Sequence, residues 1–114
     1  MSDKKRLVYL AAPYTHPDPF VKEARFHQIN RTAAKLMAQG LFVFSPISHT
    51  HPIACAGDLP GDWAYWSAYD RAILECCARM IVLRLDGWDK SSGIKGELAI
   101  AAELNLPVEY MDPA

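Results

Sequence analysis

Four short apolar runs, separated by segments of helical character, constrain the fold of this chain most strongly. The runs are Leu7–Ala12, Leu41–Phe44, Met80–Leu83 and Val108–Met111. The first three are nearly continuous apolar stretches, as is typical of strands buried on both faces of a parallel sheet. Parallel strands need a crossover between them, usually a helix, and such crossovers are right-handed. The alternation of strand and helix therefore predicts an α/β fold with one parallel sheet.

Helices are expected between these runs. The segments are Phe20–Gln39, Trp63–Cys77 and the alanine-rich stretch Leu98–Glu103. The first has apolar residues at three- and four-residue steps and is followed by Gly40, a common signal for the end of a helix. The expected architecture is a Rossmann-like or flavodoxin-like three-layer sandwich, with a four- to five-stranded parallel sheet in the order 2-1-3-4.

A single domain over residues 1–114 is expected, because 114 residues suffice for one modest core. The net charge of −1 lacks the basic excess of a nucleic-acid-binding domain, so no nucleic-acid partner is expected. No apolar run approaches the roughly 20 residues that cross a bilayer, and the charged start Met1–Arg6 is followed by no long apolar segment. These features predict a cytoplasmic protein without a membrane partner.

The cysteine pattern favours reduced thiols. Among the three cysteines of the chain, Cys76 and Cys77 are adjacent, and an odd number with this spacing does not make a disulfide framework. Both are expected at the end of the second helix, where small thiols commonly pack in the interior.

Three segments are expected at the carboxyl edge of the sheet, namely Tyr9–Thr15, Pro46–His51 and Gly87–Gly93. In parallel sheets ligands bind beyond this edge, at the switch point between the first and third strands. The stretch from Ser45 to Gly61 is expected to be a loop, and a loop of this length in a small domain is more often functional than idle. The functional site is therefore predicted at this edge, with Gly87–Gly93 at its centre.

Two acidic residues are candidates for chemistry at such a site. Glu97, near the start of the third helix, could act as a nucleophile or general base toward an anomeric carbon. Asp70, in the second helix, could hydrogen-bond a nucleobase or protonate a leaving group. The structural alternatives are a helix-capping glutamate and a solvated helical aspartate.

Histidines and tryptophans add further candidates. His49 and His51, at a spacing of two, could ligate a metal, but they lack a matching carboxylate pattern. A structural or substrate-contacting loop is favoured for them, and no metal is expected. Trp63, Trp66 and Trp88 could stack on a nucleobase. For Trp63 and Trp66, packing in the core or at a subunit interface is the favoured interpretation.

The turn before the third helix has the character of a phosphate-binding turn. Ser91, Ser92 and Gly93 precede the helix, whose free backbone N–H groups and positive dipole end face the sheet edge. The same three residues also make an ordinary turn. The segment lacks the lysine and the spacing of a P-loop, which argues against an ATPase.

Three motifs together resemble the nucleoside 2-deoxyribosyltransferase family. They are Tyr9-Leu10-Ala11-Ala12-Pro13 on the first strand, Asp70 in the second helix, and Ser91-x-Gly93-x-x-x-Glu97 after the third strand. The resemblance spans nearly the whole chain. It is closest to a branch of small proteins marked by Gly-Trp-x-x-Ser-x-Gly before the glutamate.

The resemblance implies a Rossmann-like sheet and cleavage of the N-glycosidic bond of a nucleoside or nucleotide. Glu97 matches the catalytic glutamate that forms a glycosyl-enzyme intermediate, and Tyr9 matches the tyrosine that positions it. Asp70 matches the aspartate on the nucleobase or sugar side. Ala12 and Pro13, in the same motif as Tyr9, are then expected near the substrate.

The serine of the third motif favours a nucleoside 5′-monophosphate as substrate and water as acceptor. The position six before the glutamate is an aspartate in the transferases, whereas in the family's monophosphate hydrolases it is a phosphate-holding serine. Here it is Ser91. The chemistry needs no cofactor, and because family members complete their sites across a dimer, a homodimer or homotetramer is expected. The segment Ser48–Pro52 is not part of the transferase pattern.

The expected function is thus an N-glycosidase or deoxyribosyltransferase-like enzyme acting on nucleosides or nucleoside 5′-monophosphates. One alternative is a catalytically silent nucleotide-binding or sensing protein on the same fold. Another is a structural protein, whose pocket would be filled by side chains. Convergence of Tyr9, Asp70 and Glu97 around one open pocket is the observation that separates these interpretations.

Overall fold

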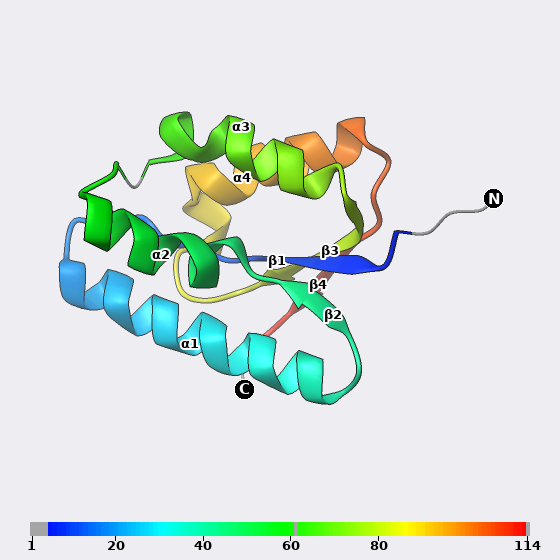
Figure 1. Ribbon diagram of the computed structural model, residues 1–114, viewed down its shortest axis with the longest axis horizontal. Helices are drawn as coiled ribbons and strands as arrows, with labels where there is room; N and C mark the ends of the chain where they lie inside the picture. The colour runs from blue at the N-terminus through cyan, green and yellow to red at the C-terminus, as the bar shows by residue number, and fades with distance from the viewer. Residues whose placement is uncertain (1–4, 61, 114) are drawn as a thin grey trace.

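A computed structural model describes residues 5–60 and 62–113 of the chain (Figure 1). The strands are β1 (Leu7–Ala11), β2 (Phe42–Phe44), β3 (Cys77–Leu83) and β4 (Val108–Met111). The α-helices are α1 (Pro19–Ala38), α2 (Pro46–Gly57), α3 (Trp63–Leu74) and α4 (Ser92–Glu103), with a short 3-10 helix, η1 (Trp88–Lys90), before α4. Residues 1–4 of the charged start and Gly61, at the end of the expected loop, lie outside the described residues.

The four strands form one parallel sheet in the order β2-β1-β3-β4. The predicted α/β fold and the predicted strand order are therefore confirmed. Helices α1 and α2 lie on one side of the sheet, and α3 and α4 lie on the other (Figure 1). The result is the expected three-layer sandwich, with β1 and β3 at its centre.

Alternate residues of β1 build the two halves of the core. Val8 and Leu10 pack with Ile29 and Leu36 of α1 on one face of the sheet. On the other face, Tyr9 and Ala11 pack with residues of α3 and α4. This alternation follows from the two-residue period of a strand that is covered on both sides. It also places the tyrosine of β1 on the same side of the sheet as α4.

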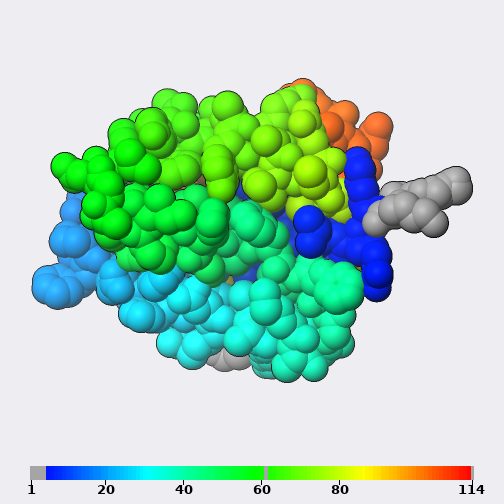
Figure 2. Space-filling model, in the orientation of Figure 1, coloured from blue at the N-terminus to red at the C-terminus, as the bar shows by residue number. Residues whose placement is uncertain are grey.

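The stretch after β2, expected to be a loop, contains helix α2, so this expectation is wrong. The helix begins because the Ser45 side chain accepts a hydrogen bond from the Ser48 N–H and because Pro46 has the fixed φ of a first helical residue. The segment was expected to be a loop because it is rich in Ser, Thr, His and Pro, and Pro52 even lies inside the helix. Asp58, in the left-handed conformation at φ 56°, ends it. Figure 2 shows the face on which α2 lies between α1 and α3.

Helix α3 ends at Leu74, three residues before the expected end at Cys77, because Cys77 is already the first residue of β3. Cys77 is buried and its thiol donates to the Ile73 carbonyl, so its packing role is confirmed. Cys76 lies in the turn between the two elements and is exposed, so the same expectation is wrong for it. Within residues 5–60 and 62–113, no helix combines the length and the apolar character needed to cross a membrane.

Candidate functional site

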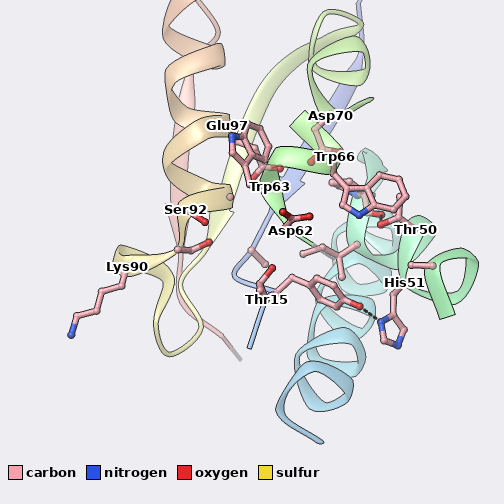
Figure 3. Close-up of a pocket in the computed structure, with 17 residues that line it drawn as sticks. Thr15, Thr50, His51, Asp62, Trp63, Trp66, Asp70, Lys90, Ser92 and Glu97 are labelled. Atoms are coloured by element: carbon pink, nitrogen blue, oxygen red, sulfur yellow. Dashed lines mark hydrogen bonds between the residues drawn. The ribbon is translucent and has the colours of Figure 1, made fainter. Parts of the chain in front are cut away.

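A partly open cavity of about 220 Å³ lies at the carboxyl edge of the sheet (Figure 3). Its lining comes from the segment after β1, from α2, from the start of α3 and from the start of α4. These include the three segments that the sequence predicts at this edge. The cavity is open, whereas a purely structural protein is expected to fill it with side chains.

Glu97 reaches the cavity from a buried position in α4. It shares the inward face of the helix with Ile94 and Ala101, at three- and four-residue steps, and is only 5% exposed. The N-cap of this helix is Ser91, whose hydroxyl accepts from the Ile94 N–H at 3.2 Å. Glu97 therefore lies beyond the first turn and does not cap the helix. A carboxyl group takes a place that helix periodicity reserves for an apolar side chain.

Tyr9 and Asp70 surround this carboxyl group. The hydroxyl of Tyr9, a fully buried residue of the central strand β1, donates a hydrogen bond to Glu97 Oε2. Asp70 comes from α3, lines the same cavity and is 9% exposed, so it is not a solvated helical acid. Tyr9 and Glu97 both lie close enough to Asp70 to change its pKa. Asp70 and Glu97 thus line one cavity, while Tyr9 contacts Glu97 without lining the cavity itself, and we refer to these three residues as the acid cluster.

Burial changes the protonation of the acid cluster. Burial and, to a smaller extent, the nearby Asp70 carboxylate raise the pKa of Glu97 to about 8, against the opposing hydrogen bond from Tyr9. Burial also raises the pKa of Asp70 to about 6, while the neighbouring Tyr9 and Glu97 side chains oppose this shift. The pKa of Tyr9 lies well above its usual value, chiefly through burial. At neutral pH the two carboxyl groups consequently hold one proton between them, on Glu97.

The N-terminal end of α4 forms another part of the cavity wall. Lys90, Ser91, Ser92 and Gly93 all line it, as the sequence predicts for the last three. Gly87 turns the preceding loop with a positive φ of 89°. The neighbouring Asp86 carbonyl accepts a hydrogen bond of 2.9 Å from Arg25 of α1. Free N–H groups at a helix start suit an anionic group.

The segment after β1 contributes unequally to the cavity. Ala12 lines the wall, as expected. Pro13, by contrast, is fully buried and does not line the cavity. Its position therefore does not support the expected direct contact with substrate.

Two of the three tryptophans line the cavity. Trp63 also packs against the core, and its indole lies directly over Gly96 of α4, where an added Cβ would be 2.2 Å from Trp63 Cε2. Trp66 lines the cavity beside it and donates from Nε1 to the Pro60 carbonyl at 2.7 Å. Trp88 lies elsewhere, with its ring centroid 5.7 Å from that of Tyr110, so its expected place at the substrate is wrong.

The two histidines of α2 have different surroundings. His51 lines the cavity, is 7% exposed and bonds to Tyr14 and Glu23. His49, two residues earlier, points to another side of the helix, is exposed and stacks on Tyr69. His51 therefore lies where a substrate contact is expected, whereas His49 does not line the cavity. Among residues 5–60 and 62–113, no group of three or more His, Cys, Asp or Glu side chains is placed to hold a metal ion.

Several lining residues were not predicted as site residues. They include Tyr14, Thr15, Thr50, Asp62 and Lys90. Tyr14 follows the first-strand motif by one residue, which is a signal that sequence analysis can use. Asp62 precedes α3 at its N-cap position, and such a residue is indistinguishable in sequence from an ordinary helix start.

Residues 6–112 match the model of a protein family described as "Domain of unknown function (DUF1937)". No curated protein matches the chain. The family description names no reaction, so the function has to be argued from the site itself.

Proposed function

The chain belongs to the DUF1937 family, and we propose that it cleaves the N-glycosidic bond of nucleosides or nucleoside 5′-monophosphates, with Glu97 as the nucleophile. One observation carries this proposal. A buried glutamate and a buried aspartate lie together on the wall of an open cavity, and a buried tyrosine donates a hydrogen bond to the glutamate. A carboxyl pair whose pKa values are separated can divide the roles of acid and nucleophile.

The first half of the reaction forms a glycosyl-enzyme ester. The shared proton moves from Glu97 to Asp70, which leaves Glu97 ionised while Tyr9 keeps its carboxylate oriented. The Glu97 carboxylate attacks C1′ of the sugar, the C1′–N bond breaks, and its electron pair passes to the base. The departing base takes the proton from Asp70.

The second half releases the sugar. A water attacks C1′ of the ester, transfers its proton to Asp70, and Glu97 departs as a carboxylate. The net reaction consumes one nucleotide and one water and yields a free base and a sugar phosphate. At the end of the reaction the two carboxyl groups again share one proton, as they did at the start.

The monophosphate is the favoured substrate because of the wall formed by the start of α4. Lys90, Ser92 and Gly93 line the cavity there. A phosphate at this helix start would meet free N–H groups. Ser91 uses its hydroxyl to cap α4, and as a cap it fixes the orientation of these groups.

The proposal is tested by measuring base release from a panel of ribo- and deoxyribonucleoside 5′-monophosphates and free nucleosides. The wild type is compared with Glu97→Gln, which keeps the size and hydrogen-bonding capacity of the side chain. We expect the substitution to reduce base release by about a thousandfold or more, because it removes the nucleophile. Glu103→Gln is the matched control, since Glu103 is exposed on the same helix and lines no part of the cavity.

Either of two results would contradict the proposal. Undiminished release by the Glu97→Gln variant would exclude Glu97 as the nucleophile. No release of any base by the wild type, combined with measurable nucleotide binding, would favour the nucleotide-sensing protein that is the alternative function for this fold.

A further inference from the structure

A second polar cluster reaches the cavity, and the proposed reaction does not use it. It joins Tyr14, in the segment between β1 and α1, to His51 of α2 and Glu23 of α1. The Tyr14 hydroxyl bonds to His51 Nδ1, and His51 Nε2 lies 2.9 Å from Glu23 Oε1. Tyr14 and His51 line the cavity, whereas Glu23 lies behind them. We refer to these residues as the histidine relay.

The donor and acceptor roles in the histidine relay follow from Glu23. An ionised carboxylate only accepts hydrogen bonds, so His51 Nε2 must carry the hydrogen in this pair. In the neutral imidazole the other nitrogen, Nδ1, is then an acceptor. Tyr14 therefore donates its single hydroxyl hydrogen to His51. Toward the cavity, the Tyr14 oxygen can then act only as a hydrogen-bond acceptor.

The surroundings hold the histidine relay in this arrangement. The His51 ring packs on Phe26 of α1, with ring centroids 4.3 Å apart, and meets the Tyr14 ring edge-on at 5.4 Å. Lys22 Nζ lies 5.1 Å from the centroid of the Tyr14 ring. Burial raises the pKa of Tyr14 to about 12, and the nearby Cys55 and Glu23 act in the same direction. The phenol accordingly remains a neutral hydroxyl.

The position of the histidine relay relates it to one part of the ligand. Lys90 and Ser92 lie on one side of the cavity, and His51 with the hydrogen bond to it lies on the opposite side, while Glu97 and Trp63 lie between (Figure 3). If phosphate binds near Ser92 and C1′ lies at Glu97, the base extends toward His51. This assignment rests on the proposed function.

We propose that Tyr14 is a specificity-determining residue whose oxygen, fixed as an acceptor by His51 and Glu23, receives a hydrogen bond from an exocyclic amino group of the leaving base. The site then prefers amino bases over the corresponding keto bases. Cytosine is preferred to uracil, and adenine to hypoxanthine. A keto oxygen facing the Tyr14 lone pairs would leave two acceptors opposed, which typically costs a factor of about ten or more in affinity.

The first test addresses the histidine relay without any ligand. Nitrogen-15 NMR at about pH 8 reports the tautomer of His51, with the signal assigned by its loss in His51→Phe. We expect the hydrogen on Nε2 and an accepting Nδ1. A hydrogen on Nδ1 would overturn the inference, because the Tyr14 hydroxyl would then be free to donate into the cavity.

The second test measures nucleotide binding to Glu97→Gln, which does not turn the ligands over. The probes are the 5′-monophosphates of cytidine, uridine, adenosine and inosine. We expect each amino nucleotide to bind about ten times more tightly than its keto partner. Tyr14→Phe, which removes the acceptor, and His51→Phe, which releases the hydroxyl, should each reduce this preference to about twofold or less. His49→Phe, in the same helix and outside the cavity, should preserve it.

The outcomes separate this inference from the proposed function. Base release by the wild type without an amino preference overturns the inference and leaves the reaction in place. An amino preference that depends on Tyr14, in a protein that releases no base, supports the inference and overturns the reaction. Failure of all four nucleotides to bind overturns both.

Discussion

At the scale of single residues, Glu97 replaces an apolar side chain on the inward face of α4. Removal from water disfavours its charged form, the hydrogen bond from Tyr9 compensates in part, and the nearby Asp70 disfavours the charge further. A second carboxyl group in contact makes two simultaneous charges unfavourable. Perturbed pairs of this kind concentrate at functional sites, because the same environment that is costly for folding separates an acid from a base.

The protonation of the acid cluster predicts a bell-shaped pH dependence of kcat/KM for base release. Below about pH 6 both carboxyl groups are protonated and no nucleophile exists, and above about pH 8 both are ionised and no acid exists. The two limbs belong to the coupled pair rather than to either residue alone. The maximum is expected near pH 7, measured as initial rates across a constant-ionic-strength buffer series.

Asp70→Asn tests this assignment. The variant loses the acid, so its alkaline limb should disappear and its rate should drop by about 10² to 10⁴. The pKa of Glu97 should also fall, because the neighbouring negative charge is gone. Asp89→Asn, at an exposed residue of η1 outside the cavity, serves as the control. A variant that keeps the full bell would exclude Asp70 as the acid.

At the scale of helices and strands, the sequence was most informative where the pattern is periodic. The apolar runs located β1, β2, β3 and β4, and the flavodoxin-like architecture predicted their order. Helix α2 was missed because its Ser45 cap and Pro46 start are also turn signals. The helical conformation of α2 also affects the site. It presents His51 to the cavity and turns His49 away from it, and a loop would not predict this difference.

The residues of the site also divide into those that a sequence pattern predicts and those that it does not. The acid cluster was predicted because its residues belong to motifs, whereas the histidine relay was not, since its members are brought together only by packing. Tyr14 and His51 are 37 residues apart in the sequence, and His51 and Glu23 are 28 apart. Neither spacing carries a pattern.

The contact between α3 and α4 gives a prediction for Gly96. Alanine normally stabilises a helix interior by about 1 kcal/mol relative to glycine. Here its Cβ would be 2.2 Å from the Trp63 indole, so we expect Gly96→Ala to destabilise the protein by about 1 to 3 kcal/mol and to weaken nucleotide binding as Trp63 moves. Urea unfolding measures the first effect and equilibrium titration the second.

The matched comparison is Gly93→Ala in the same helix. Its added Cβ would meet Ser91 Oγ at an ordinary 3.7 Å, so the free energy of unfolding should stay constant or rise. Trimming the indole in the double variant Gly96→Ala/Trp63→Phe should recover part of the lost stability. If Gly96→Ala proves as stable as Gly93→Ala, then Trp63 does not pack tightly on α4.

At the scale of the whole molecule, the acid cluster makes stability depend on pH. The pKa of Glu97 is raised in the folded protein from 4.5 to about 8. A raised pKa means that the stabilising contribution is complete below about pH 4.5 and is lost as the pH rises toward 8. Asp70, with its pKa raised from 3.8 to about 6, acts in the same direction over a lower range.

Glu97→Gln isolates this effect, because glutamine stays neutral throughout. The variant and the wild type should have similar free energies of unfolding near pH 4.5. By pH 9 the variant should be the more stable by something on the order of 3 kcal/mol, and denaturant melts at the two pH values measure the difference. Equal pH dependence of the two proteins would show that Glu97 is already ionised in the folded state.

The homodimer or homotetramer expected from the resemblance stays a prediction.

The hydrogen bond between Tyr9 and Glu97 links two residues that are 88 positions apart. One lies in the first strand and the other in the last helix, and Asp70 comes from a third element between them. Contacts of such long range form late, because the intervening chain must be closed into a loop first. A chain that has folded only as far as β3 has no acid cluster. The acid cluster therefore exists only in the completely folded molecule, and the proposed base release would be a readout of complete folding.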